Sequence, residues 1–308
     1  VFGWTLGGTR LLLSSYPQPD SRIMFRRDIR RRVRTLAPFL RFDDDPYVVL
    51  RNGRMVWIVD AYTTSADYPY SEPFRPRGLG PGGSVENIRS LGGATYVRNS
   101  VKAVVDAYNG DVTFYAMDDA DPVLNTWRRI YPGLFRPRDE MPADLFAHVR
   151  YPQDLLLTQG LVYGKYHMTN PDVFYNQEDL WVRATEKYYQ SVQPVEPYYI
   201  LWKPPDANRA EYVLMLPFTP KRRQVLIGWI AGMCDGENYG RFVAYKFPKE
   251  KRVIGPQQVE TKIDQDRNLS SQLTLWDQRG SSVLRGNMLA IPVEDTLLYV
   301  EPIYLRAD

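Results

Sequence analysis

Residues 47–62 have the sequence YVVLRNGRMVWIVDAY, in which two apolar runs flank a central Asn-Gly pair. Val, Ile, Tyr and Trp favour strands because branched and aromatic side chains pack well on a pleated surface. Asn52 and Gly53 can both adopt the positive φ of a tight hairpin turn, so the stretch predicts two antiparallel strands. The same arrangement recurs at residues 101–117, where Asn109-Gly110 separates the runs.

Helical patterns surround these hairpins. Residues 21–37 repeat an apolar residue every three or four positions, which places Phe25, Ile29, Val33 and Leu36 on one helix face. Ser21 is the expected N-cap of this helix, and Pro38 is its expected end. Further helices are predicted at residues 122–131 with Asp121 as N-cap, 143–167 with a break at Pro152, 178–190 and 221–233.

Short strands dominate after Pro194. They are predicted at residues 198–203, 211–216, 241–247, 257–263, 271–276, 282–285, 288–292 and 296–304. Antiparallel β-hairpins and sheets with segregated helices are typical of the α+β class, which is the fold class we predict. We expect a mixed α+β part at residues 1–193, with a mobile loop at 72–93, and a β-rich part at 194–308 that is separate or continuous with the first.

Composition limits the chemistry. The 308 residues include one Cys and two His, which excludes an internal disulfide framework, a Cys-rich zinc site and a haem-attachment motif. We expect Cys234 to be a buried structural thiol, because no histidine partner accompanies it in the sequence. Nucleophile-elbow, phosphate-loop and zinc-protease motifs are also absent from the sequence.

The sequence still allows a calcium site, because calcium is bound through oxygen ligands. The candidate ligands are Asp118, Asp119 and Asp121, and then Asp264, Asp266 and Asn268. The second set alternates as calcium-loop ligands do, but Leu269 and Leu275 occupy the positions where an EF-hand needs Gly and Glu. The alternative for these residues, and for Asp43 to Asp45, is turn chemistry, in which Asp side chains accept backbone N–H bonds.

His148 and His167 are the candidate catalytic residues, because histidine is the side chain that ordinarily titrates near neutral pH. A hydrolase would pair one of them with an Asp of the Asp-Pro clusters. The alternative is a structural histidine bonded to backbone or to a tyrosine hydroxyl.

Charge is unevenly distributed. The net charge is +3, but residues 1–42 carry nine Arg against two Asp. The basic face of the predicted helix comprises Arg26, Arg27, Arg30, Arg31 and Arg34. It could face an anionic membrane surface or the rest of the protein, or be solvated or paired within the chain; we do not expect nucleic acid, because no base-reading motif accompanies it.

Aromatic residues form a second candidate surface. Tyr188-Tyr189, Tyr198-Tyr199 and Trp202 could make a carbohydrate- or peptide-binding platform. The alternative is that they belong to strands and core.

Several segments together resemble uncharacterised protein family 0182. They are residues 21–42, Asp45-Pro46-Tyr47, residues 57–63, Tyr68-Pro69-Tyr70-Ser71, residues 98–102, residues 148–152, Tyr166-His167-Met168, residues 216–220, residues 255–258 and residues 299–302. The resemblance covers nearly the whole chain. It implies a bacterial multi-pass membrane protein with a large extracytoplasmic domain, of which this chain would be the C-terminal part, anchored through membrane helices that precede it. It implies no activity, cofactor or catalytic residue.

Three functions remain open from the sequence. The leading hypothesis is a non-catalytic extracytoplasmic domain on the outer side of the bacterial cell membrane, binding an envelope component or a partner protein. The alternatives are an envelope hydrolase that uses His148 or His167, and a calcium-binding accessory domain of a membrane assembly.

Overall fold

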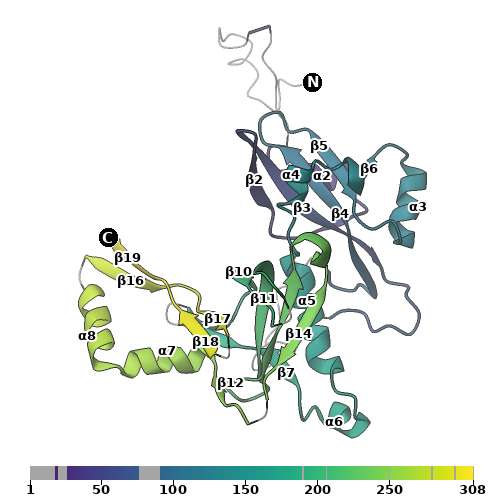
Figure 1. Cartoon of the computed structure of the whole chain (residues 1–308). Coiled ribbons are helices and arrows are strands. Elements are labelled where there is room, and N and C mark those ends of the chain that lie inside the picture. The colour runs from purple at the N-terminus through teal and green to yellow at the C-terminus, as the bar shows by residue number, and fades with distance from the viewer. Residues whose placement is uncertain are drawn as a thin grey trace.

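The computed structural model describes residues 18–19, 26–75, 91–188, 191–205, 207–248, 250–278, 280–294 and 296–307. A six-stranded sheet forms one end of the molecule, a five-stranded sheet forms the middle, and a C-terminal arm projects from the middle (Figure 1). The predicted α+β class is confirmed.

The six-stranded sheet is built on the two hairpins found in the sequence. Strands β2 (Tyr47–Arg51) and β3 (Arg54–Ser65) pair antiparallel, and the turn residues Asn52 and Gly53 both have positive φ. Strand β4 (Tyr96–Asp106) pairs with β3 and with β5 (Val112–Ala116). The short strands β1 (Arg41–Phe42) and β6 (Phe135–Pro137) complete the sheet.

The helices of this part begin at side-chain caps. Helix α2 (Ile29–Leu36) starts after Asp28, whose carboxylate accepts from Arg31 N. The predicted start was therefore wrong for residues 26–28, which are not helical, while residues 21–25 lie outside the described residues. Helix α3 (Pro122–Ile130) has Asp121 as its N-cap and Pro at its first position, as predicted. Elements η2 (Arg138–Glu140) and α4 (Ala143–Phe146) lead to the middle part.

The five-stranded sheet packs against helix α5 (Gln153–Tyr166). Its strands are β7 (Trp181–Arg183), β10 (Tyr198–Trp202), β11 (Glu211–Pro220), β13 (Gly228–Met233) and β14 (Phe242–Lys246). Gly160 lets α5 approach closely, because a Cβ there would lie 2.7 Å from Ile230 Cδ1. One core cluster joins both parts: it includes Tyr62 of β3, Leu156 of α5 and Leu216 of β11.

Two predicted helices proved to be strands. Residues 221–233 contain β12 (Val225–Leu226) and β13, and residues 178–190 contain β7 and β8 (Thr185–Tyr188). Every residue of β13 is buried, and a short strand buried on both faces has the same continuous apolar run as a buried helix. Gly228 and Gly232, which interrupt this apolar run, are the signal that sequence reasoning missed. Gly228 allows the neighbouring strand to approach closely, because a Cβ there would lie 2.1 Å from the Tyr245 carbonyl oxygen.

The opposite error occurred in the arm. Residues 257–263 and 271–276, predicted as strands, belong to helices α7 (Pro256–Gln265) and α8 (Arg267–Trp276). Pro256 at the first helical position and the Asp266 cap before α8 outweigh the short alternation of apolar residues.

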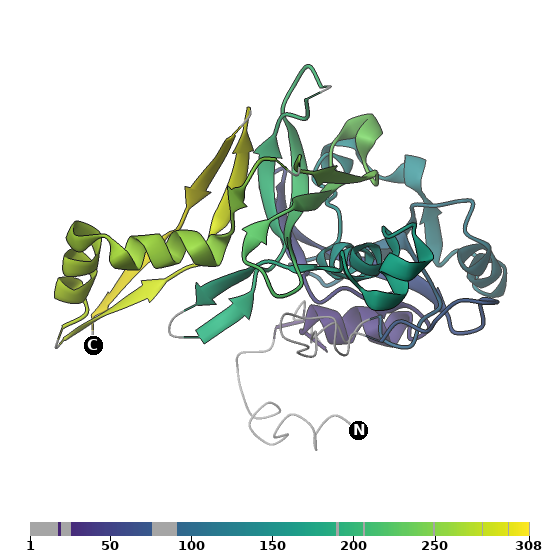
Figure 2. The ribbon, with the colours of Figure 1, turned by 90° about the horizontal axis from the view of Figure 1, so that it is seen from below.

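The arm is completed by two-stranded ribbons. Strand β16 (Ser281–Arg285) pairs with β19 (Ile303–Ala307), and β17 (Leu289–Val293) pairs with β18 (Thr296–Val300). Figure 2, seen at a right angle to Figure 1, shows the arm standing away from the two sheets. The remaining short elements are α6 (Pro171–Asn176), β9 (Ser191–Pro194), η3 (Gly236–Asn238) and β15 (Val253–Ile254).

Both ends of the predicted loop at 72–93 are anchored. Phe74 and Leu91 are buried in the core, and Phe74 N donates to the Ala94 carbonyl oxygen at 2.8 Å. Residues 76–90 lie outside the described residues.

Candidate functional site

A buried ion pair lies at the centre of the junction between the two sheets. Asp60 of β3 and Lys102 of β4 stand directly opposite each other in the sheet register. Their side chains form an ion pair, and both are almost fully buried. Charges are rarely buried in this way unless they are paired, because removal from water costs several kcal/mol per ion.

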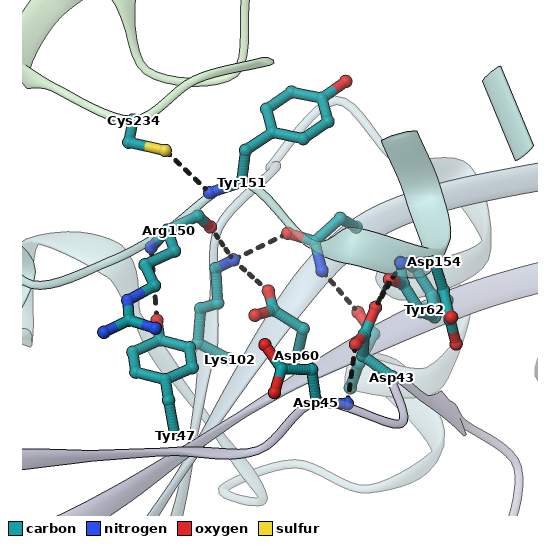
Figure 3. A network of polar contacts seen from close by, with 12 residues as sticks. Asp43, Asp45, Tyr47, Asp60, Tyr62, Lys102, Arg150, Tyr151, Asp154 and Cys234 are labelled. Carbon is teal, nitrogen blue, oxygen red and sulfur yellow. Dashed lines mark hydrogen bonds and ion pairs between the residues drawn. The ribbon is translucent and has the colours of Figure 1, made fainter. Parts of the chain in front are cut away.

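Lys102 has one acceptor for each of its three ammonium protons. Nζ donates to an Asp60 carboxylate oxygen, to Asn99 Oδ1 at 2.8 Å and to the Arg150 carbonyl oxygen at 3.1 Å (Figure 3). Burial works to lower the pKa of Lys102, but Asp60 outweighs it and the pKa is raised. Lys102 is therefore charged at every physiological pH.

Carboxylates gather beside this pair. Asp43 accepts hydrogen bonds from the Tyr62 hydroxyl, from Asp154 N at 3.1 Å and from Asp45 N at 2.9 Å. Burial raises the pKa of Asp43 to about 7, and the nearby carboxylates of Asp154 and Asp60 add to the rise. Asp43 is thus a carboxyl group that changes its protonation near neutral pH.

The segment between α4 and α5 carries the network to the five-stranded sheet. The Arg150 guanidinium lies over the rings of Tyr47, at 4.5 Å, and Tyr199, at 5.1 Å. Tyr151 N donates to Cys234 Sγ at 3.3 Å, and its carbonyl oxygen accepts from the Tyr199 hydroxyl at 2.8 Å. Cys234 is buried, and burial raises the pKa of its thiol to about 11. The network thus ties the six-stranded sheet, α5 and the five-stranded sheet together.

Sequence reasoning did not predict this polar network, although the sequence contained a signal for its central ion pair. Asp60 and Lys102 are charged residues inside otherwise apolar strands, and such residues are buried only when paired. Several members, including Asp45, Asp60, Lys102 and Arg150, lie in segments that carry the family resemblance.

The two candidate catalytic histidines lie apart. His148 follows α4 and is exposed, whereas His167 is the C-cap of α5, a helix of 14 residues and therefore about 21 Å long. His167 Nδ1 lies 3.0 Å from the Tyr163 carbonyl oxygen, its ring is close to that of Trp181, and Nε2 lies 3.6 Å from an Asp179 oxygen. Among the described residues, neither histidine forms a hydrogen bond or an ion pair with an Asp of the Asp-Pro clusters.

The first candidate calcium set is divided among other partners. Asp118 pairs with Arg98 and Asp119 pairs with Arg128. Asp121 is buried and accepts from the hydroxyls of Thr63 at 2.5 Å, Ser100 at 2.5 Å and Tyr96 at 2.8 Å, and from Val123 N at 2.9 Å. Burial works to raise the pKa of Asp121, but these donors outweigh it and the pKa is lowered.

The second candidate set connects the arm to the middle part. Asp264 forms ion pairs with Lys187 and Arg285, while Asp266 caps α8 and accepts from Asn268 N and Leu269 N. In the described ranges, no group of three or more His, Cys, Asp or Glu residues is placed to hold a metal ion. Calcium therefore stays a prediction from the sequence, to be tested by melting with calcium and with a chelator.

The basic residues near the N-terminus are divided as well. Arg30 and Arg34 each lie 3.8 Å from an Asp44 carboxylate oxygen. Arg31 is exposed on α2, and Arg26 and Arg27 are exposed ahead of it. Part of the predicted basic face is thus paired within the chain.

The described aromatic residues of the predicted platform do not form one surface. The Tyr198 hydroxyl donates to the Ala290 carbonyl oxygen, Tyr199 is bonded to Tyr151, and Trp202 is buried in the core. Tyr188 is exposed on β8, and Tyr189 lies outside the described residues.

The tip of the arm is an apolar surface that sequence reasoning missed. We define the arm tip as α8, β16 and β19. None of the residues described in α8, β16 or β19 is buried, and every residue of β19 is exposed. Its exposed large apolar side chains are Leu269, Leu275, Trp276, Ile303, Tyr304 and Leu305.

The base of the arm, in contrast, is held by ion pairs and by hydrogen bonds to carboxylates. The Arg285 guanidinium makes two parallel bonds to the Glu301 carboxylate, at 2.5 and 2.7 Å, and a third bond to Asp264 at 2.5 Å. Glu186 accepts from Met288 N at 2.7 Å, and Glu260 accepts from Lys187 N at 2.7 Å. The arm is therefore fixed at its base, while the described residues of its tip include no buried side chain.

Fold and site together define an α+β protein part with a buried ionic junction and a projecting apolar arm. The family model described as Uncharacterised protein family (UPF0182) matches residues 1–276. The chain belongs to this family, as the resemblance had indicated. No solved structure matches the chain.

Curated relatives are similar over the entire chain. They include UPF0182 proteins of Pelotomaculum thermopropionicum, 49% identical over 308 residues, and of Methanospirillum hungatei, 50% identical over 307 residues. The match covers 100% of this chain but 32% and 33% of those two proteins. The chain thus spans about a third of the length of these relatives. Among the residues described, no helix is both long and apolar enough to cross a membrane.

Proposed function

We propose that this chain is a non-catalytic extracytoplasmic part of a membrane-anchored protein and that it binds another polypeptide through the arm tip. The observation that carries the proposal is the arm tip itself, in which none of the described residues is buried although many are apolar. A helix with a two-stranded ribbon gains little stability unless its apolar surface is covered. The location outside the membrane rests on the family resemblance.

The free edge of β19 favours a polypeptide as the ligand. Within the described residues, β19 pairs only with β16, so its other edge presents unpaired N–H and C=O groups. Such an edge binds another strand through main-chain hydrogen bonds, and alternate side chains then pack on the added strand.

The simplest strand that fits is a second β19, and we propose a second copy of the chain as the occupant. Two copies of a strand can pair antiparallel about a two-fold axis, which buries the same surface on both copies. Leu305 is the central residue of β19, so it would face the Leu305 of the other copy. Ile303 and Leu305 lie on the same face of β19, and full burial of these two side chains would contribute about 1.5–3 kcal/mol each.

Cysteine crosslinking tests the pairing directly. The native thiol of Cys234 is buried, so Leu305→Cys introduces the reactive thiol. We expect disulfide-linked dimers of Leu305→Cys under mild oxidation. The matched control is Leu50→Cys, because Leu50 is a similarly exposed leucine, 69% against 57%, on the edge strand β2.

The crosslinking result shows whether a second copy of the chain pairs with the free edge of β19. Crosslinking of Leu305→Cys to itself, but not of Leu50→Cys, supports the second copy. Equal crosslinking of both variants, or none, contradicts pairing through β19. In cells that make the whole protein, labelling of Leu305→Cys by a membrane-impermeant maleimide supports the extracytoplasmic location, and labelling only after lysis contradicts it.

A further inference from the structure

A hollow of about 540 Å³ lies at one end of the five-stranded sheet. It is formed by the ends of β10, β11, β13 and β14 with the described parts of the loops between them, and none of its lining residues belongs to the arm tip. The lining residues used below are Trp202, Arg209, Glu211, Asn238, Arg241 and Tyr245. A volume of this size is within the usual range for small-molecule sites, about 300–1,000 Å³.

Glu211 is the unusual residue of this hollow. It lies opposite Trp202 in the register of β10 and β11 and is only 4% exposed. Its Oε1 accepts from Asn238 Nδ2 at 2.7 Å, but its buried Oε2 has no hydrogen-bond partner among the described residues. A buried carboxylate oxygen without a donor is costly, so a ligand that donates to it would relieve that cost.

The surroundings hold this carboxylate in position. Arg241 Nη1 donates to Asn238 Oδ1 at 2.7 Å, and Asn238 in turn donates to Glu211. The Trp202 and Tyr245 rings meet edge to face, with centroids 4.9 Å apart. Because Trp202 is buried, the partly exposed ring of Tyr245 is the aromatic surface of the site. The site therefore combines a fixed acceptor, guanidinium donors and this ring.

The charges of the described lining balance. Arg209 and Arg241 are matched by Glu211 and Glu237, so the lining favours a neutral ligand over an ion. A neutral ligand that donates and accepts several hydrogen bonds, and that also has apolar C–H faces for aromatic rings, is a polyhydroxylated sugar.

We propose that this hollow binds a neutral saccharide of one or two residues, with Glu211 Oε2 accepting a sugar hydroxyl and the two arginines donating to sugar oxygens. The sheet carries this site and the arm tip carries the protein-binding surface. The saccharide proposal therefore stands or falls independently of the proposed function.

Calorimetric titration of the 308-residue chain tests the proposal. The probes are glucose, N-acetylglucosamine and their β1,4-linked dimers, with glucuronate and glucosamine as charged counterparts. The site variants are Glu211→Gln, which replaces the acceptor with a donor at constant size, and Arg241→Ala. The control is Arg129→Ala, because Arg129 is an exposed arginine of α3 outside the hollow.

We expect at least one neutral sugar to bind and its affinity to fall about tenfold or more in both site variants, as for the loss of a charged hydrogen bond. The control should bind as the unchanged chain does. Arg241 is exposed, so Arg241→Ala keeps the test valid even if Glu211→Gln fails to fold. Absence of binding by the neutral sugars at about 10 mM, binding of charged sugars only, or binding that neither site variant weakens would each overturn the proposal.

Discussion

Replacement of Lys102 by Met removes the only cation that contacts Asp60 in the described network while keeping a side chain of similar length. The Lys102 ammonium has three acceptors and is fully buried. Lys102→Met leaves the Asp60 carboxylate buried without its partner, close to Asp43. Loss of one member of a buried ion pair costs about 3–5 kcal/mol, which is a large part of a typical total stability of about 5–15 kcal/mol.

A double-mutant cycle measured by urea unfolding isolates the pair. We expect Lys102→Met and Asp60→Asn each to lower the free energy of unfolding by about 3–5 kcal/mol. The double variant should lose no more than the worse single variant, because neither charge is then left alone. The coupling energy is then at least the smaller of the two single losses, about 3 kcal/mol.

The exposed pair of Arg128 and Asp119 supplies the control. Its atoms are 2.7 Å apart, but Asp119 is largely exposed, so Arg128→Met should cost at most about 1 kcal/mol. Single variants of Lys102 and Asp60 that cost no more than Arg128→Met, or whose effects simply add, would refute the buried ion pair as the junction's main polar contact.

Three further predictions concern other parts of the fold. Burial raises the folded-state pKa of Asp43 to about 7, above the usual range of a free Asp. Its contribution to stability is therefore complete below about pH 4 and is lost as the pH rises through 7; unfolding midpoints should show this slope, and Asp43→Asn should remove it. Gly232→Ala should destabilise the fold by about 1–3 kcal/mol, because its Cβ would lie 2.3 Å from the Tyr151 ring, whereas Gly92→Ala, with open space around it, should not. Equal melting temperatures for the two variants would contradict the close packing of Gly232 on Tyr151. Asp121→Ala should lower the free energy of unfolding by about 2–4 kcal/mol, because it removes a helix cap and leaves buried hydroxyls unpaired. Asp118→Ala, which breaks the exposed pair with Arg98, should lower it by under about 1 kcal/mol, and a larger loss from Asp118→Ala than from Asp121→Ala would contradict this ranking.

Local signals in the sequence predicted the elements that depend on local chemistry. The Asn-Gly turns gave both hairpins, and Asp121-Pro122 gave the start of α3, because turn and cap preferences act within a few residues. The errors arose where tertiary packing, rather than local preference, determines the secondary structure. Residues 225–233 form strands because β13 is buried on both faces.

The site was harder to predict for the same reason. Asp60 and Lys102 are 42 residues apart in the sequence, and their ion pair depends on the register of β3 with β4. One sequence gives no direct information about that register. The candidate histidines and Asp clusters were chosen by residue type, and the structure places them in separate contacts. The exposure of the arm tip is likewise invisible in a sequence whose apolar residues could equally have formed a core.

The molar mass of the 308-residue chain in solution tests the central claim most directly, because pairing through β19 requires two copies in one particle. Light scattering coupled to gel filtration should give twice the 35.7 kDa of one chain, and Tyr304→Asp, which places a charge on the paired strand, should return the single-chain mass. A single-chain mass for the unchanged protein at every concentration, or a dimer that Tyr304→Asp leaves intact, would contradict the arm tip as the surface that joins two copies.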